Sequence, residues 1–304
     1  MQDAITWNAA EVLPDPPLPA RVARGTLRFI RRKPLGALGA AIILILLLAA
    51  AFGPLAAPYR YDEYQLGRRY RLQPPSREHL MGTDQLGRDI FSRLLYGARI
   101  SVFIGVGVVA ISIALSTVLS VVSGYYASTA DLVIQRLVEV WVAMPQLIIL
   151  IALMAIYGAN PLTLVLTIGV SIGLAGSRVI RGVVIGLRGS PFIEAAKACG
   201  ASDTRILLHH ILPNVLFLIV VGATAGVAAA ITAEAGLAVL GFGISPTYPS
   251  WGRMIHDSRE FLRVAPWMAI FPVIALSLVI YGFGLFGDAL RDITDPRLRG
   301  RRRG

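Results

Sequence analysis

Apolar residues along this chain gather in long blocks that polar segments separate. The first block covers residues 35–57 and contains an unbroken aliphatic run at 42–48. Further blocks follow at 100–122, 132–157, 162–180, 215–242 and 266–290. Because an α-helix needs about 20 apolar residues to cross the hydrocarbon core of a bilayer, each block predicts one crossing. The pattern therefore predicts an all-α membrane protein with six transmembrane helices.

The composition supports this class and excludes others. Of the 304 residues, 55% are hydrophobic and 15% are charged, whereas soluble domains carry about 25% charged residues. The single cysteine, Cys199, excludes an internal disulfide framework and is expected to pack between helices. The net charge of +11 does not indicate nucleic-acid binding, because no basic patch is interleaved with aromatic residues and basic flanks are what orients a membrane protein.

The distribution of basic residues predicts the orientation. Residues 1–34 form a polar tail that ends in a basic interfacial segment, and residues 291–304 form a second basic tail. Six crossings place both tails and the segment at 178–213 on one side, which holds more than half of the 29 Lys and Arg and is therefore expected to be cytoplasmic. Residues 58–98 are then external, although they are also rich in arginine. A cleaved signal peptide, the competing interpretation of the first block, is disfavoured by its long charged lead and long apolar run.

The polar segment between the fourth and fifth blocks carries its own helix signals. Ser190 and Pro191 suit the first positions of a helix, and Gly200 suits the left-handed position that ends one. Ser202 or Asp203 can cap a second helix. The sequence therefore predicts a helix–turn–helix outside the membrane at residues 186–213.

The same segment carries a recognisable motif. Its residues are Glu194, Ala195, Ala196, Gly200, Ile206, His210, Leu212 and Pro213, with Pro213 marking the return to the membrane. Their spacing resembles the EAA loop in the permease subunits of ABC importers. The resemblance implies a type I ABC importer permease fold, with residues 99–290 as its core and this loop as the cytoplasmic coupling helix that docks on an ATPase subunit. An ordinary amphipathic loop is the alternative. A metal site at the paired histidines is disfavoured, since no further ligands recur at useful spacing.

A second motif precedes the second block. The stretch around Asp84, Arg88 and Asp89 resembles the corresponding segment in the dipeptide/oligopeptide/nickel branch of these permeases, of the second-permease C type. Trp251, in the last external loop, fits the same branch and is also expected at a membrane interface. The resemblance implies that this face meets an extracytoplasmic solute-binding protein. The alternative is that the two aspartates pair with arginines and order a surface turn.

A few residues inside or beside the blocks stand out. Glu234 and Arg178 are charges within predicted spans, where a functional or paired role is the default. Pro145 and Pro272 are expected to kink their helices. The C-terminal stretch with Asp288 and Asp292 resembles the ending of the same branch and is expected to cap the last span. Departures from the family pattern at 238–241 and at Gly284 leave the substrate open.

These features together imply a transport subunit. The resemblance implies a permease of an ATP-driven ABC importer in the bacterial inner membrane. It would pair with a related permease, two cytoplasmic ATPases and a binding protein, and would move a small solute by alternating access. Di- or oligopeptides are favoured, and nickel or another small solute is the alternative. No Walker lysine motif is present, so ATP and Mg²⁺ are expected only in the partner ATPases. Catalytic, cofactor and metal sites are expected to be absent from this chain. An intramembrane enzyme lacks a visible nucleophile–base pair, and an ATPase-independent channel is the remaining class.

Overall fold

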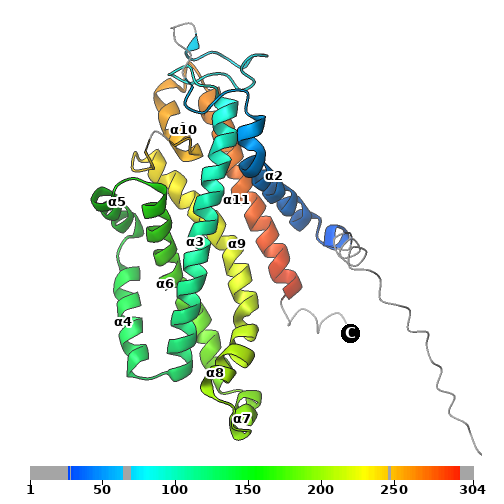
Figure 1. Ribbon diagram of the computed structural model, residues 1–304, viewed down its shortest axis with the longest axis vertical. Helices are drawn as coiled ribbons and strands as arrows, with labels where there is room; N and C mark the ends of the chain where they lie inside the picture. The colour runs from blue at the N-terminus through cyan, green and yellow to red at the C-terminus, as the bar shows by residue number, and fades with distance from the viewer. Residues whose placement is uncertain (1–26, 28, 64–69, 246–247, 295–304) are drawn as a thin grey trace, which may run out of the picture.

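A computed structural model describes residues 27, 29–63, 70–245 and 248–294, and this part of the chain is helical (Figure 1). The only extended pairing within these residues is a single bridge between Thr83 and Asp89. The helices are α2 (Pro34–Ala56), α3 (Ile90–Tyr126), α4 (Thr129–Ala143), α5 (Gln146–Tyr157), α6 (Pro161–Arg188), α7 (Pro191–Ala198), α8 (Asp203–Ile206), α9 (Leu212–Val239), α10 (Trp251–Ser258) and α11 (Trp267–Thr294), with a π-helical turn η2 (Leu207–Ile211) and a 3-10 turn η3 (Arg259–Phe261). The predicted all-α class is confirmed.

Five helical runs are long and apolar enough to cross a membrane, and a sixth crossing requires a bent pair. The five are α2, α3, α6, the run Asp203–Val239 and α11. The sixth comprises α4 and α5, which meet at an angle of 88°. Met144, between them, has an extended backbone, which the following Pro145 favours for steric reasons. The predicted kink at Pro145 is therefore a sharp break.

The boundaries of two predicted segments shift. Helix α3 begins at Ile90, so its first turns belong to the segment predicted to be external and polar. Helix α11 continues to Thr294, past the predicted start of the C-terminal tail. The tails themselves, at 1–26 and 295–304, lie outside the described residues.

The second helix of the predicted helix–turn–helix is the base of the next span. Helix α8, turn η2 and helix α9 form one continuous run of 37 residues. Within the π turn, the Leu212 N–H donates to the Leu207 carbonyl five residues earlier. The wider turn relieves the break expected at Pro213, which has no N–H, and the Asn214 side chain donates to the His210 carbonyl at 2.6 Å. The chain thus returns to the membrane without a break.

Close helix packing surrounds α3. Gly169 of α6 faces α3, where an added Cβ would lie 2.9 Å from the Ile111 side chain. On the other side, Gly53 of α2 packs against Leu95 of α3, and α2 in turn packs on α11, where a Cβ added at Gly39 would lie 2.6 Å from the Gly282 oxygen. Small residues at such crossings let helices approach in lipid, where packing drives association. A buried cluster that includes Ile104, Leu164 and Leu237 joins α3, α6 and α9.

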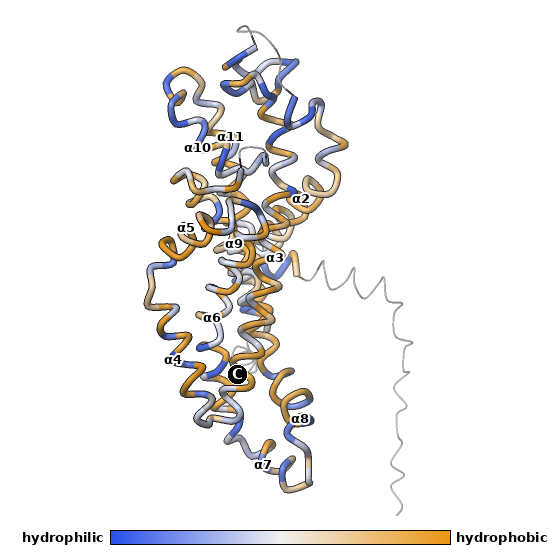
Figure 2. Tube along the Cα trace, turned by 60° about the vertical axis from the view of Figure 1, so that its left-hand side comes forward, coloured by the Kyte–Doolittle hydropathy of each residue, from blue (hydrophilic) through white to orange (hydrophobic). Residues whose placement is uncertain are grey.

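Polar residues lie at the two ends of the molecule and apolar residues lie between them (Figure 2). One end holds residues 70–89 and α10, which we call the polar cap. The opposite end holds α7 and α8, which belong to the EAA loop, residues 186–213. The fold thus separates the two motif regions by the full length of its helices (Figure 1).

Candidate functional site

Helix α7 begins where the sequence predicts. Ser190 has the extended backbone of an N-cap and Pro191 occupies the first helical position. The Ser190 hydroxyl does not cap the helix, however, and donates to the Leu187 carbonyl at the end of α6 at 2.5 Å. Glu194 lies in the first turn of α7, where the helix dipole favours a negative charge.

The end of α7 follows the predicted glycine signal. Gly200 has a φ of +79°, a left-handed value that favours glycine. The Ala201 N–H donates to the Ala196 carbonyl at 3.0 Å, and the Gly200 N–H donates to the Lys197 carbonyl at 2.9 Å. These two bonds make a Schellman motif. The Ser202 hydroxyl then accepts from the Arg205 N–H, so Ser202, and not Asp203, caps α8.

The inner side of the EAA loop is an apolar anchor. Ile193, Ile206 and Ile211 have no exposed surface. They belong to one cluster with Val184 of α6 and Val215 of α9. If this end of the molecule lies outside the membrane, as the sequence predicts, burial of each such side chain stabilises the loop by about 1.5–3 kcal/mol. Ile206 of the motif therefore acts as an anchor, and Leu212 packs beside it.

The outer side of the EAA loop presents polar and small residues. Glu194, Ala195 and Pro213 are exposed, while Ala196 and His210 are half-buried. Cys199 is also exposed at the end of α7, which corrects the expectation that it packs between helices. The motif thus divides into buried anchors and an exposed face, with Gly200 as the turn between them.

Polar contacts tie the EAA loop to the end of α3. The Tyr125 hydroxyl donates to Asp203 Oδ1 at 2.5 Å. The Lys197 ammonium lies 5.5 Å from the centre of the Tyr125 ring, a cation–π distance. The His210 ring lies 6.5 Å from the Phe192 ring, between centroids. The first two contacts connect both arms of the loop to one membrane helix.

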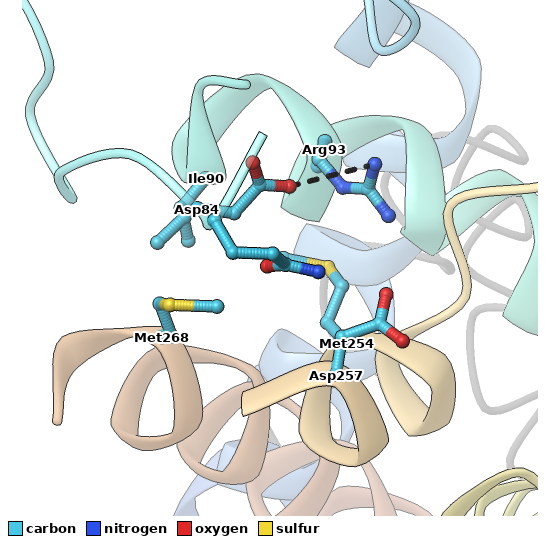
Figure 3. A pocket seen from close by; sticks show the side chains of 7 residues that line it. Asp84, Ile90, Arg93, Met254, Asp257 and Met268 are labelled. Carbon is cyan, nitrogen blue, oxygen red and sulfur yellow. Dashed lines mark ion pairs between the residues drawn. The ribbon is translucent and has the colours of Figure 1, made fainter. Parts of the chain in front are cut away.

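The polar cap buries the acidic residues of the second motif. Asp84 accepts from the Arg88 backbone N–H at 2.9 Å and from Arg88 Nε at 2.6 Å, and Arg93 lies 3.8 Å from the same carboxylate (Figure 3). All three side chains are less than a tenth exposed. A cavity of about 10 Å³ lies between Asp84 and Asp257 of α10, which is space for about one water molecule.

The second aspartate of the cap begins helix α3. Asp89 Oδ2 accepts from the Ser92 N–H at 2.7 Å as the N-cap, and its Oδ1 lies 2.9 Å from His79 Nδ1. The Tyr59 ring stacks on His79 with centroids 5.0 Å apart. Burial raises the pKa of the Tyr59 phenol, and the charge of Asp89 raises it further. The Tyr59 hydroxyl donates to the Glu78 carbonyl at 3.3 Å.

Trp251 is an internal residue of the cap. It is 3% exposed, and its indole N–H donates to the Leu94 carbonyl of α3 at 2.9 Å. Gly97 lies beneath it, where an added Cβ would lie only 2.7 Å from the indole ring. Trp251 is therefore a packing residue inside the protein, and its expected place at a membrane interface stays a prediction. Like Asp84, Arg88 and Asp89, Trp251 orders the cap from within, as the ion-pair alternative describes for the aspartates.

Comparison with known proteins identifies the family. A family model described as binding-protein-dependent transport system inner membrane component matches residues 82–300. The chain belongs to this family. A second model, the N-terminal TM domain of oligopeptide transport permease C, matches residues 23–75 of the permease. The permease is therefore a multi-pass inner-membrane transport protein and not an enzyme, and the predicted ABC importer permease fold is confirmed.

Individual relatives cover nearly the whole permease. It is 40% identical over 277 residues to the dipeptide transport system permease protein DppC of Alkalihalophilus pseudofirmus, covering 91% of this chain and 90% of that protein. It is 37% identical over 273 residues to the glutathione transport system permease protein GsiD of Shigella dysenteriae, and also to that of Pectobacterium atrosepticum, with 90% of each chain covered.

Charged residues of the permease spans have distinct surroundings. Glu234 is 2% exposed, and its Oε1 has no hydrogen-bond partner among the described residues. Arg178 is half-buried. Sequence reasoning missed Arg181, which donates to both oxygens of Asp131 at 2.8 and 2.6 Å and so joins α6 to α4. The signal that could have found Arg181 is its spacing, because it follows Arg178, which the sequence did single out, by one helical turn.

The sequence predicts that Asp288 and Asp292 cap the last span, and in the structure one of them forms an ion pair with the residue before the first span. Asp292, near the end of α11, pairs with Lys33 just before α2. Asp288 is exposed one turn earlier. Gly36 and Gly39 also bring α2 against α11. The Lys33–Asp292 ion pair therefore lies at one end of a close helix–helix contact.

Proposed function

We propose that this permease imports di- or oligopeptides, which an extracytoplasmic binding protein delivers. The proposal rests on the family and on relatives named for dipeptide and glutathione transport. Both kinds of molecule are small peptides with free carboxylates. Nickel or another small solute, the alternative that the sequence left open, gains no support from these relatives.

The coupling role belongs, in this proposal, to α7. The observation that carries it is the division of the EAA loop into a buried isoleucine anchor and an exposed small-residue face. A short helix held this way can fill a groove of a partner and pass the motion of that partner to the spans. ATP and Mg²⁺ would bind to two cytoplasmic ATPase subunits. Closure of the ATPase pair would then drive alternating access.

Assembly and orientation complete the proposal. A related permease would form the other half of the pathway. The EAA loop and both tails would face the cytoplasm, in keeping with the excess of Lys and Arg on that side. The polar cap would then face the binding protein. Its buried ion pairs would stabilise the fold of the cap, and its exposed residues would contact the binding protein.

Gly200 offers a direct test in the reconstituted importer. We expect Gly200→Val to abolish ATP-dependent dipeptide uptake, because a β-branched residue is strained at a φ of +79° although the space around it is open. Gly200→Asn is the matched control, since asparagine tolerates this conformation, and it should retain most of the uptake.

Membrane insertion and ATPase binding are measured in parallel. Cys199 is the single cysteine of the chain and is exposed, so maleimide labelling reports whether an ATPase subunit covers α7. We expect the ATPase to protect Cys199 in the unsubstituted permease. Normal uptake by Gly200→Val, or labelling of Cys199 that is unchanged by the ATPase, would contradict the coupling role.

A further inference from the structure

An open cavity of about 480 Å³ lies beside the outer half of α3. Its lining comes from three places in the chain: α3, the start of α6, and the loop after α9. The lining residues are Arg99, Ile100, Phe103, Asn160, Pro161, Leu162 and Tyr248. The volume is within the range of small-molecule sites, which are mostly apolar with a few polar groups. This cavity has that composition, with one charged residue.

Arg99 is an exposed residue of α3 that directly precedes the apolar block at 100–122. Gly53, in the last turn of α2, packs against Leu95 of α3. Arg99 follows Leu95 by four residues, which places it about 6 Å further along α3 toward the membrane interior. A charge within a membrane helix is costly and by default marks a functional site or a buried pair.

Within the described part of the chain, the charge of Arg99 has no anionic partner. Arg99 makes no ion pair with a described residue, and the cavity lining contains no Asp or Glu. Other arginines of this half are different, since Arg88 and Arg253 pair with carboxylates of the polar cap. Arg99, in contrast, is exposed at a cavity with its guanidinium available.

The surroundings of Arg99 favour an anion further. Asn160 is the N-cap of α6, a helix of 28 residues, so the positive end of that helix dipole lies at the same cavity. The Asn160 amide donates one N–H to the Tyr157 carbonyl at 3.5 Å, and its second N–H and the Tyr248 hydroxyl add hydrogen-bond donors. The apolar walls of Phe103 and Leu162 reduce competition from water and strengthen a charge-assisted bond.

We infer that Arg99, with Asn160 and Tyr248, binds the free carboxylate of a peptide substrate as it enters the permease. This inference rests on the proposed peptide import. Arg99 would make this permease favour substrates with a C-terminal carboxylate over the same peptides without one. A guanidinium suits this role because its planar donors match the two oxygens of a carboxylate.

The test compares two ligands and two forms of the complete importer in proteoliposomes. Uptake of dialanine and of dialanine C-terminal amide is measured for the unsubstituted complex and for Arg99→Gln. Loss of a charge-assisted bond lowers uptake of the free acid by about tenfold or more, while uptake of the amide changes little. The binding protein is identical in both complexes. Its own preference therefore cancels when the ratio of acid uptake to amide uptake is compared between Arg99→Gln and the unsubstituted complex. Arg263→Gln, an exposed arginine outside the cavity, is the matched control and should leave both rates unchanged.

Three results separate the explanations. Equal loss for both ligands overturns the inference, and if that loss also depends on the fraction of anionic lipid, Arg99 binds a lipid headgroup instead. Unchanged uptake of both ligands by Arg99→Gln also overturns it and leaves peptide import intact. Absence of ATP-dependent peptide uptake by the unsubstituted complex overturns the proposed function and this inference with it. Arg99→Lys, which keeps the charge but loses the planar donors, should retain part of the preference for the free acid.

Discussion

The polar cap and the EAA loop both looked like polar islands, yet they are built in opposite ways. In the cap, Arg88 and Arg93 are buried against the Asp84 carboxylate, Arg88 through a hydrogen bond and Arg93 as an ion pair. In the EAA loop, the isoleucines are buried and Glu194 faces outward. Polar residues thus hold the first region together, whereas in the second they are displayed on an apolar base. A motif of polar residues therefore indicates a docking surface only when something else supplies the packing.

Removal of the central carboxylate of the cap should have the largest effect. Asp84→Ala takes away an acceptor of buried arginine and backbone donors, and a broken buried pair costs about 3–5 kcal/mol. We expect a large drop in the unfolding temperature of the purified permease, followed by tryptophan fluorescence. Asp62→Ala breaks the exposed pair with Arg60 and should leave that temperature unchanged. Similar curves for both variants would show that the cap does not depend on its buried charges.

An anchor of the EAA loop should come next. Ile206→Ala leaves a cavity beneath the loop and should cost about 2–5 kcal/mol. Because the exposed face is untouched, ATPase subunits should still bind, but ATP hydrolysis should no longer drive uptake efficiently. Leu208→Ala, at a side chain that is 54% exposed, is the control for assays of uptake per ATP hydrolysed. Equal coupling in the two variants would contradict the anchor role.

The contact between α10 and α9 should give the smallest effect. An added Cβ at Gly252 would lie 2.7 Å from the Ala235 backbone, so Gly252→Ala must shift α10 and should cost about 1–3 kcal/mol. Gly236→Ala on the facing helix meets no atom within 4 Å and should be neutral or slightly stabilising. Thermal unfolding of the two alanine variants checks the difference, and equal unfolding temperatures would be evidence against tight packing of α10.

Local signals in the sequence predicted the local structure well. The apolar blocks and the glycine turn at Gly200 depend on neighbouring residues alone. The structure has five of the blocks as single helical runs, the sixth as a bent pair, and the turn as predicted. Of the two caps that the sequence offered for α8, it has Ser202. Long-range partners were not predictable in this way. The pairing of Asp89 with His79 crosses an irregular loop, and the pair of Asp131 with Arg181 joins residues fifty positions apart.

Two further differences have clear physical reasons. A proline at 145 removes a helical hydrogen bond and so predicts a bend, but a local signal does not specify its size, which is 88° in the structure. An indole N–H needs an acceptor, and the sequence does not say whether that acceptor is a headgroup or, as for Trp251, a backbone carbonyl inside the protein. The roles of the EAA loop residues toward an ATPase stay predictions.

The π turn between α8 and α9 has a consequence for rotational phase. A π turn contains one residue more than an α-helical turn, and each residue of an α-helix corresponds to about 100° around its axis. Turn η2 therefore rotates the faces of α9 by about 100° relative to those of α8, compared with an uninterrupted α-helix. Glu234, more than twenty residues further along α9, thus lies on a face whose angular offset from Ile206 of the motif includes the extra residue of the π turn, inside the loop that is proposed to meet the ATPase.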